Sequence, residues 1–153
     1  KMVLKGDSSL LVNRKPFFIP DWSEDIRMTP CVVLRVSRMG KHIGTRFAHR
    51  YYDAVALGLN LYAADYLKKG DWTRAFGFDG SLPFGSWLEV EDNPYGDLVV
   101  DIDTSIAEVS KIMTIRQGDM IVIDRKLAAR RLEKEEVICV EQNNEEILYC
   151  KIK

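Results

Sequence analysis

The run Cys31-Val32-Val33-Leu34-Arg35-Val36 is the stretch on which the prediction of the fold depends. Its β-branched and aliphatic residues favour a strand, and Met39-Gly40-Lys41 breaks the run. A second apolar run, Val55–Leu61, predicts another buried strand. We therefore expect a strand-rich domain.

The segments around these two runs predict shorter elements. Leu10–Val12 and Phe17–Ile19 are apolar and are separated by the turn-like Asn13-Arg14-Lys15-Pro16, which predicts a hairpin of two short strands. The composition of Phe47–Ala54 suits a short helix, and Ala63–Lys69 predicts one or two further helical turns.

The middle of the chain predicts a hairpin followed by a helix. Trp87–Glu91 and Leu98–Asp103 are expected to be strands joined across Asn93-Pro94-Tyr95-Gly96, a strong turn signal. Apolar residues at helical spacing predict a helix over Ser105–Met113. Thr104 or Ser105 is expected to cap the start of this helix.

The last third of the chain predicts three more strands. They are Met120–Ile123, introduced by Gly118-Asp119, and Val137–Val140 and Ile147–Ile152, joined across Asn143-Asn144. Many short strands with a few short helices indicate an α+β fold of the mixed β-roll kind.

Composition limits the function classes. The 153 residues suit one domain spanning 1–153, and 46% hydrophobic residues can form a core. Lys and Arg number 22 against 23 Asp and Glu, which argues against nucleic acid or a membrane surface as the partner. No signal peptide is evident, so Cys31, Cys139 and Cys150 are expected to be reduced thiols in a cytoplasmic protein.

The residues alone indicate no intact site. His42 and His49 have no activated nucleophile beside them, and no phosphate loop, dinucleotide fingerprint or zinc spacing is present. The mixed-sign segment from Asp119 to Glu136 is most simply a solvated loop. We therefore expect no catalytic residues and no metal ligands.

Five segments in order nevertheless resemble one known family. They are Lys5–Ser9, Arg38–Ile43, Arg46–Asp53, Phe78–Gly85 and Gly118–Ile121. Phe78–Gly85 is similar to the end of a Lys-x-x-Asp-x-x-x-Pro-x-Gly motif, and Gly118–Ile121 to a Gly-Asp-Leu-Ile segment. Together they resemble the fumarylacetoacetate hydrolase family in its bacterial acylpyruvate-hydrolase and 2-hydroxyhepta-2,4-diene-1,7-dioate isomerase-like form.

The resemblance implies a β-roll of that family's C-terminal-domain type, and commonly a homodimer. It implies Mg²⁺ or Mn²⁺ held by a Glu-x-Glu pair on one strand and an Asp on the next. The metal would support hydrolysis or decarboxylation of a β-keto acid. The family's N-terminal segment, which commonly carries a His-Glu pair on a lid, has no counterpart before Lys1, so a shortened member is expected.

Departures from the family pattern fall on its chemistry. Thr29, Cys31 and Asn60 stand at the three metal-ligand positions, so the Mg²⁺ or Mn²⁺ site is expected to be lost and no cofactor is expected. Phe76 stands at the motif lysine, and Asp124 lies in the segment that replaces the closing Thr-Gly-Thr-Pro loop. The other expected vestiges of the substrate pocket are Lys5, Asp65 and Asp79.

Two functions follow as hypotheses. The first is a catalytically degenerate member that acts as a binding or interaction module, as a homodimer or paired with an active paralogue. It would bind a small organic acid without metal, with Arg27 and Lys5 as anion partners. The alternative is a hydrolase, decarboxylase or isomerase acting on an acylpyruvate-like β-keto acid with altered or no metal dependence. Its acid–base group would combine Asp65 and Asp79 with His49 or Lys68.

Overall fold

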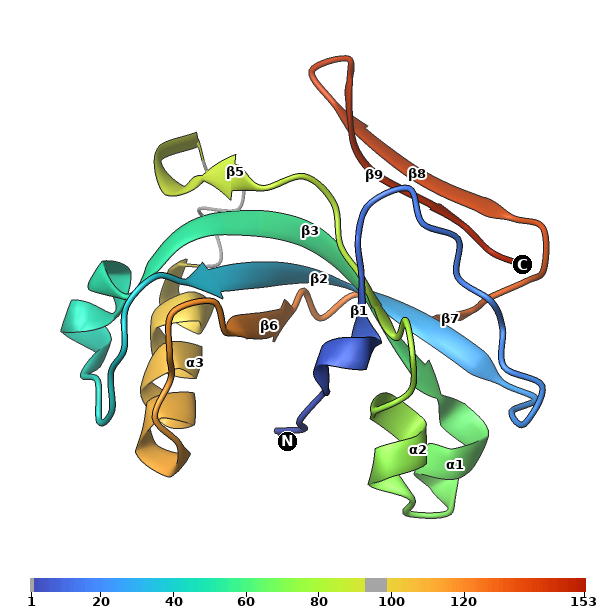
Figure 1. Ribbon diagram of the computed structural model, residues 1–153, viewed down its shortest axis with the longest axis horizontal. Coiled ribbons are helices and arrows are strands. Elements are labelled where there is room, and N and C mark those ends of the chain that lie inside the picture. Colours follow the sequence, from blue (N-terminus) through green and yellow to red (C-terminus); the bar gives the residue numbers. More distant parts are fainter. Residues whose placement is uncertain (1, 93–98) are drawn as a thin grey trace. The chain divides into compact units, whose positions relative to one another are not determined.

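The structure is a computed structural model that describes residues 2–92 and 99–153 (Figure 1). The chain divides into two compact units. Unit 1 comprises Lys1–Cys31, Leu57–Ser86 and Asp124–Lys153, and unit 2 comprises Val32–Ala56 and Trp87–Ile123. Two long strands each contain residues assigned to both units. The expectation of a single domain over 1–153 stays a prediction.

The two shared strands are β2 (Ile26–Val36) and β3 (Tyr52–Ala63). Unit 1 also contains η1 (Asp7–Ser9), β1 (Leu10–Leu11), α1 (Ala64–Lys68), α2 (Trp72–Phe76), β4 (Leu82–Pro83), β7 (Arg130–Arg131), β8 (Val137–Gln142) and β9 (Glu145–Lys151). Unit 2 also contains η2 (Thr45–Arg50), β5 (Leu88–Glu89), η3 (Val90–Asp92), α3 (Val99–Ile112) and most of β6 (Met120–Asp124).

The largest sheet has the strand order β5-β3-β2-β6, and β7 pairs with another part of β2. Strands β1 and β4 form a parallel pair, and β8 and β9 form an antiparallel pair. This mixture of sheets with short helices confirms the predicted α+β class. Within the described residues, no helix is long and apolar enough to cross a membrane.

The two apolar runs that decided the fold prediction are confirmed as strands. Both Cys31–Val36 and Val55–Leu61 lie inside longer strands whose side chains are mostly buried. The predicted strands at the end of the chain are also confirmed. Asn143 and Asn144 both have positive φ, which suits the tight turn between β8 and β9.

The predicted hairpin of Leu10–Val12 and Phe17–Ile19 is wrong. Leu10 pairs in parallel with Leu82, and Phe17 forms a parallel bridge to Ile152. Each segment therefore pairs with a partner far along the chain. This pairing buries Phe17, whereas Val12 and Phe18 remain exposed.

Two predictions about helices also need correction. The segment predicted as a helix over Phe47–Ala54 is split: the 3-10 helix η2 ends at Arg50, and β3 begins at Tyr52. The described part of the predicted strand Leu98–Asp103 belongs to α3, because buried Ile102, Ile106 and Ala107 keep helical spacing. Thr104 and Ser105 consequently lie inside α3 and do not cap it. The predicted turn at Asn93–Gly96 lies outside the described residues.

Candidate functional site

The positions expected to hold the metal lie on β2 and β3 within unit 1. Ala64 donates a backbone hydrogen bond of 2.8 Å to Asp25, and the arrows of β2 and β3 run in opposite directions in Figure 1. Continued from this bond, an antiparallel ladder puts Thr29 opposite Asn60, and the influence of Tyr62 on Arg27 agrees with that register. The bond from Ser37 to Tyr51 requires a one-residue shift between this end of the strands and the other. Two of the three expected ligand positions are therefore cross-strand neighbours.

These neighbours point to the more open face of the strands. Thr29 and Asn60 are half-buried, whereas Met28 and Leu61, which point the other way, are buried. Part of each of these two side chains is therefore accessible, although the Oδ1 atom of Asn60 is itself buried.

The third expected ligand position, Cys31, is fully buried. Burial raises the pKa of its thiol to about 12, opposed by the positive charge of Lys5 and assisted by the negative charge of Asp124. The thiol is consequently neutral at physiological pH, and a neutral thiol is a weak metal ligand.

Asn60 has an unusual hydrogen-bonding state. Its Oδ1 atom is buried and has no hydrogen-bond partner among the described residues. Most buried polar atoms are paired with protein or ordered water. The unpaired oxygen is therefore an unmet hydrogen-bond acceptor inside the fold.

Lys5 lies close to this site but is fully engaged. Its ammonium group donates to the carbonyl oxygens of Phe76 (2.7 Å), Leu61 (3.2 Å) and Ser81 (3.3 Å), and to the Ser81 hydroxyl (2.9 Å). Burial lowers the pKa of Lys5 to about 8, partly offset by Cys31. An ammonium group has three N–H donors, and these acceptors use all of them. The anion-binding role expected for Lys5 therefore does not fit this geometry.

Phe76, at the position of the family's motif lysine, belongs to an aromatic stack. Its ring lies 5.8 Å from Tyr62 and 5.7 Å from Trp72, with interplanar angles of 27° and 25°. The helix that carries it is capped by Asp71, whose side chain accepts from the Arg74 amide. An apolar ring stack thus stands where the family pattern requires a charged amine.

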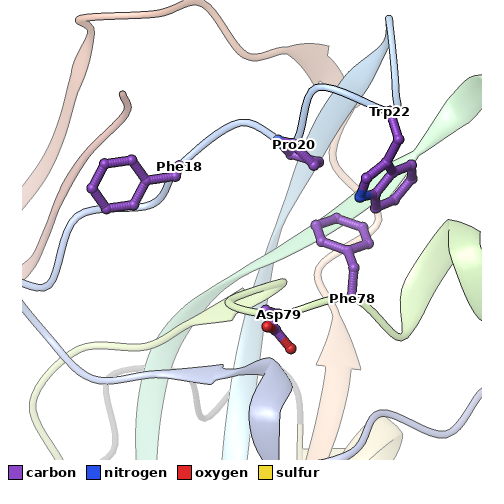
Figure 2. Close-up of a pocket in the computed structure, with 5 residues that line it drawn as sticks. All are labelled: Phe18, Pro20, Trp22, Phe78 and Asp79. Carbon is purple, nitrogen blue, oxygen red and sulfur yellow. The ribbon is translucent and has the colours of Figure 1, made fainter.

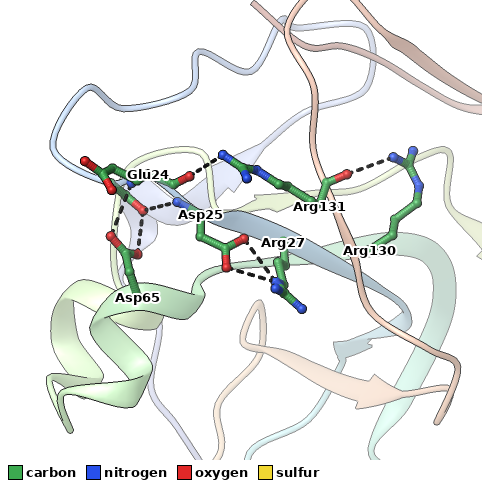
Figure 3. A network of polar contacts seen from close by, with 7 residues as sticks. Glu24, Asp25, Arg27, Asp65, Arg130 and Arg131 are labelled. Carbon is green, nitrogen blue, oxygen red and sulfur yellow. Dashed lines mark hydrogen bonds and ion pairs between the residues drawn. The ribbon is translucent and has the colours of Figure 1, made fainter.

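Arg27 and Asp65 lie in a polar network at the start of β2 (Figure 3). The Arg27 Nε atom donates to both carboxylate oxygens of Asp25, at 3.0 and 3.2 Å. Asp65 accepts from the Ser23 hydroxyl at 2.7 Å and from the Glu24 amide at 3.2 Å. Asp65 therefore holds a local turn.

The remaining expected pocket residues are both exposed. Asp79 lies in a turn closed by a hydrogen bond from Ser81 to Phe78. Asp124, at the end of β6, accepts from the Lys126 amide at 2.8 Å.

His49 lies in unit 2, where its charge acts on Asp103. The expected acid–base group of Asp65 and Asp79 with His49 or Lys68 is therefore not established.

The mixed-sign segment before β8, expected to be a solvated loop, makes local contacts. Arg131 donates to the Glu24 carbonyl, and Arg130 donates to the Arg131 carbonyl at 3.3 Å (Figure 3). Arg130 also pairs with Glu136 at 2.9 Å. Sequence reasoning missed the neighbouring strand β7, which pairs Arg131 with Arg27. No apolar signal marks so short a strand.

The donor set does not fit the Mg²⁺ or Mn²⁺ that the family resemblance implies. Thr29 and Asn60 offer neutral oxygens, and Cys31 offers a neutral buried thiol. Mg²⁺ prefers charged oxygen ligands in octahedral geometry. Across residues 2–92 and 99–153, no group of three His, Cys, Asp or Glu side chains could hold a metal ion.

Comparison with known proteins gives one curated relative at low identity. The chain is 22% identical over 162 residues to the mitochondrial oxaloacetate tautomerase fahd-1 of Caenorhabditis elegans. The aligned region covers 90% of this chain and 76% of the relative. No family model matches the chain.

Solved structures show the fold more clearly. The chain matches a protein assigned to the fumarylacetoacetate hydrolase family from Yersinia pestis CO92, with a TM-score of 0.83 and 18% identity over 97% of this chain and 83% of that one. It matches 5-carboxymethyl-2-hydroxymuconate delta-isomerase from Mycobacterium smegmatis with a TM-score of 0.87 and 19% identity, over 98% of this chain and 67% of the isomerase. It matches fumarylpyruvate hydrolase from Pseudomonas aeruginosa, solved with Mn²⁺ and pyruvate, with a TM-score of 0.81 and 14% identity, over 97% and 76%.

These likenesses confirm the resemblance seen in the sequence. The chain has the fold of the fumarylacetoacetate hydrolase family, whose members include isomerases and hydrolases. It spans about two thirds of the length of the mycobacterial isomerase.

Proposed function

We propose that this chain is a metal-independent binding module built on the fumarylacetoacetate hydrolase fold, and not a working enzyme of that family. The observation that carries the proposal is the placement of Thr29 opposite Asn60, where the resemblance expects two carboxylates. Without those charges, a divalent cation has little to offset the loss of its hydration shell.

The electrostatics of the surrounding residues support the same proposal. Lys5 is cationic below a pKa of about 8, and Cys31 is neutral below a pKa of about 12. A dication placed here would meet a buried ammonium and no thiolate. The site therefore favours a neutral or anionic ligand over a metal ion.

The ligand we propose for this site is a small organic acid, with Arg27 as its anion partner. Asp25 holds Arg27 through Nε, which fixes the guanidinium and leaves the two Nη groups directed away from Asp25 (Figure 3). Arg27 and Thr29 lie two residues apart on the same strand face, about 7 Å along the strand. The Asn60 side chain would have to turn its buried oxygen toward this ligand to accept a hydrogen bond from the ligand's hydroxyl group.

A binding experiment tests this assignment. Calorimetry in the presence of EDTA would compare malate with succinate, which lacks the hydroxyl group. We expect malate to bind more tightly, and Arg27→Gln to weaken both by about tenfold. Arg130→Gln is the matched control, because Arg130 is exposed and paired with Glu136. If Arg27→Gln and Arg130→Gln bind malate with equal affinity, Arg27 is not part of the ligand site.

A gain-of-function variant tests the loss of the metal site directly. Thr29→Glu with Asn60→Asp places two carboxylates opposite each other on the half-buried strand face. We expect this double variant to take up Mn²⁺, while Thr29→Gln, of similar size without charge, does not. Equal Mn²⁺ uptake by both would show that these positions do not control metal binding.

The alternative is an enzyme acting on an acylpyruvate-like β-keto acid with altered or no metal dependence. It is favoured by the names of the similar proteins, which include a hydrolase, an isomerase and a tautomerase. An assay with oxaloacetate and fumarylpyruvate, with EDTA and with Mn²⁺, decides between the two functions. Turnover that is lost in Arg27→Gln and retained in EDTA would favour the alternative.

Pairing with a second chain is part of the proposal. The family resemblance implies a homodimer, and a chain without its own chemistry could instead pair with an active paralogue. Light scattering on the purified chain gives its mass in solution. A dimer mass supports self-association, and a monomer mass favours a different partner chain.

A further inference from the structure

A hollow of about 400 Å³ lies on unit 1, and none of Arg27, Thr29 and Asn60 lines it. It is lined by Phe18, Pro20, Trp22, Phe78 and Asp79. Figure 2 shows Trp22 and Phe78 next to each other and Phe18 on the opposite side of the hollow. Pro20 lies between Phe18 and Trp22. Phe18 is 64% exposed and Trp22 is 40% exposed, which is unusual for large aromatic side chains.

The backbone holds these walls in place. The backbone amide of Phe17 donates to the Lys151 carbonyl, and the Phe17 carbonyl accepts from the Lys153 amide. Because side chains alternate along an extended chain, Phe17 points inward and Phe18 points outward. A turn in which Ser23 donates to Pro20 presents Trp22. The hollow is therefore largely formed before any ligand binds.

A second turn carries the other two lining residues. Gly80 has a φ of +68°, and a Cβ atom there would lie 3.3 Å from the Phe17 ring. The turn needs glycine for both reasons. It fixes Phe78 against Trp22 and leaves Asp79 exposed beside them.

The shape of the aromatic walls selects among ligands. The Trp22 and Phe78 rings are 5.6 Å apart and meet at 79°, so they form a corner and not a parallel slot. A planar guanidinium stacks best on one flat face, whereas a rounded ammonium bearing methyl groups can contact two perpendicular walls. Asp79 also lines the hollow, and its carboxylate points away from the two rings (Figure 2), so it would act on a bound cation through its charge and not by contact.

Cations of the chain itself already lie over rings of this cluster. The Lys153 ammonium lies 5.8 Å from the Phe18 ring centre, and the Lys5 ammonium lies 6.0 Å from that of Phe78. Aromatic ring faces attract cations through their quadrupole, most strongly when the cation is partly desolvated. Lys153 is exposed and so can be displaced by another cation.

We propose that this hollow is a binding site for an alkylated ammonium group, such as a quaternary amine. The aromatic corner would contact the methyl groups, and Asp79 would neutralise the charge. Lys153 would compete for the Phe18 face. The inference is independent of the proposed organic-acid site, because it uses none of Arg27, Thr29 and Asn60.

The test uses choline and its neutral isostere 3,3-dimethylbutan-1-ol as probes. Ligand-observed NMR would measure both dissociation constants and the upfield shift of the methyl protons caused by the aromatic rings. We expect millimolar binding of choline, at least about fivefold tighter than the isostere. Guanidinium is a third probe and should bind more weakly than choline.

Matched variants locate the site. Asp79→Asn should weaken choline binding about fivefold, while Asp21→Asn, at an exposed acid in the adjacent turn, should not. Phe18→Leu should reduce the methyl shift with little risk to folding, because Phe18 is mostly exposed. Lys153→Met should strengthen choline binding.

Three results would overturn the proposal. They are equal affinity for choline and the neutral isostere, equal effects of the Asp79 and Asp21 variants, and tighter binding of guanidinium than of choline. Each would mean that the hollow is an apolar patch or a site for another kind of cation.

Discussion

Lys5 donates a hydrogen bond of 2.7 Å from its ammonium nitrogen to the carbonyl oxygen of Phe76, 71 residues further along the chain. The same ammonium also reaches Leu61 and Ser81, so one side chain joins the N-terminal segment to β3, to α2 and to the turn before β4. Lys5 is thus a structural residue next to the proposed ligand site.

The first prediction follows from this contact. Lys5→Met keeps much of the side-chain volume but leaves three partly buried carbonyl groups without their donor. We expect it to reduce the free energy of unfolding by about 2 kcal/mol, measured by urea denaturation. Lys15→Met is the control, because Lys15 is exposed. Similar losses in both variants would contradict the structural role of Lys5.

The second prediction concerns pH. The pKa of Lys5 is about 8 in the folded chain, against 10.5 for an ordinary lysine. Between these values the unfolded chain binds more protons at this residue, so the contribution of Lys5 to stability rises with pH. We expect the stability difference between wild type and Lys5→Met to grow from pH 8 to pH 10 in denaturation curves.

Cys31 acts in the opposite direction over a similar range. The pKa of its thiol is about 12 in the folded chain, against 9.0 for an ordinary cysteine, so the unfolded chain loses this proton first and stability falls above about pH 9. Comparing wild type with Lys5→Met cancels this effect up to pH 10, because the folded thiol stays protonated in both chains: its pKa is about 12 in wild type and rises when the charge of Lys5 is removed. A stability difference that shrinks from pH 8 to pH 10 would contradict the lowered pKa of Lys5.

The third prediction concerns Gly85. A Cβ atom at this position would lie 1.8 Å from the backbone oxygen of Ile147, which no side-chain movement can relieve. Gly85 also donates to Leu57 at 2.8 Å, so it cannot move away freely. Gly85→Ala should lower the free energy of unfolding by about 3 kcal/mol or prevent folding. Gly6→Ala, with no atom within 4 Å of its Cβ, should leave the melting temperature nearly unchanged.

The fourth prediction compares two asparagines. Asn60 Oδ1 is buried without a partner among the described residues, whereas Asn13 Oδ1 accepts from the Tyr149 amide at 2.8 Å. In the absence of ligand, Asn60→Leu should be neutral or stabilising, and Asn13→Leu should destabilise by about 1 kcal/mol. Thermal melting of both variants checks this. A larger loss for Asn60→Leu would show that Asn60 is held by the protein itself.

The strands that could be predicted from sequence carry their own signal. The apolar runs around Val33 and Leu57 and the turn at Asn143-Asn144 indicate structure through nearby residues alone. The pairing of Phe17 with Ile152 could not be predicted, because it depends on a contact between segments more than a hundred residues apart. Such pairings are decided by packing of the whole chain.

The candidate site was predictable to a similar extent. The resemblance identified Thr29, Cys31, Asn60 and Phe76 as positions of interest before any geometry was known. The engagement of Lys5 was not predictable, because its acceptors are mostly backbone carbonyls, which every residue type carries. The aromatic hollow was missed because Phe18, Trp22 and Phe78 come together only in the folded chain.

The most direct test of metal independence is electron paramagnetic resonance of Mn²⁺ added to the wild-type chain, with and without oxalate. Free Mn²⁺ gives a six-line signal that is lost when the ion binds. We predict that, at millimolar Mn²⁺, the signal of each sample equals that of the matching protein-free control. Loss of the signal on adding oxalate, beyond that in a protein-free control, would show that Thr29, Cys31 and Asn60 still support a metal site and would contradict the proposed function.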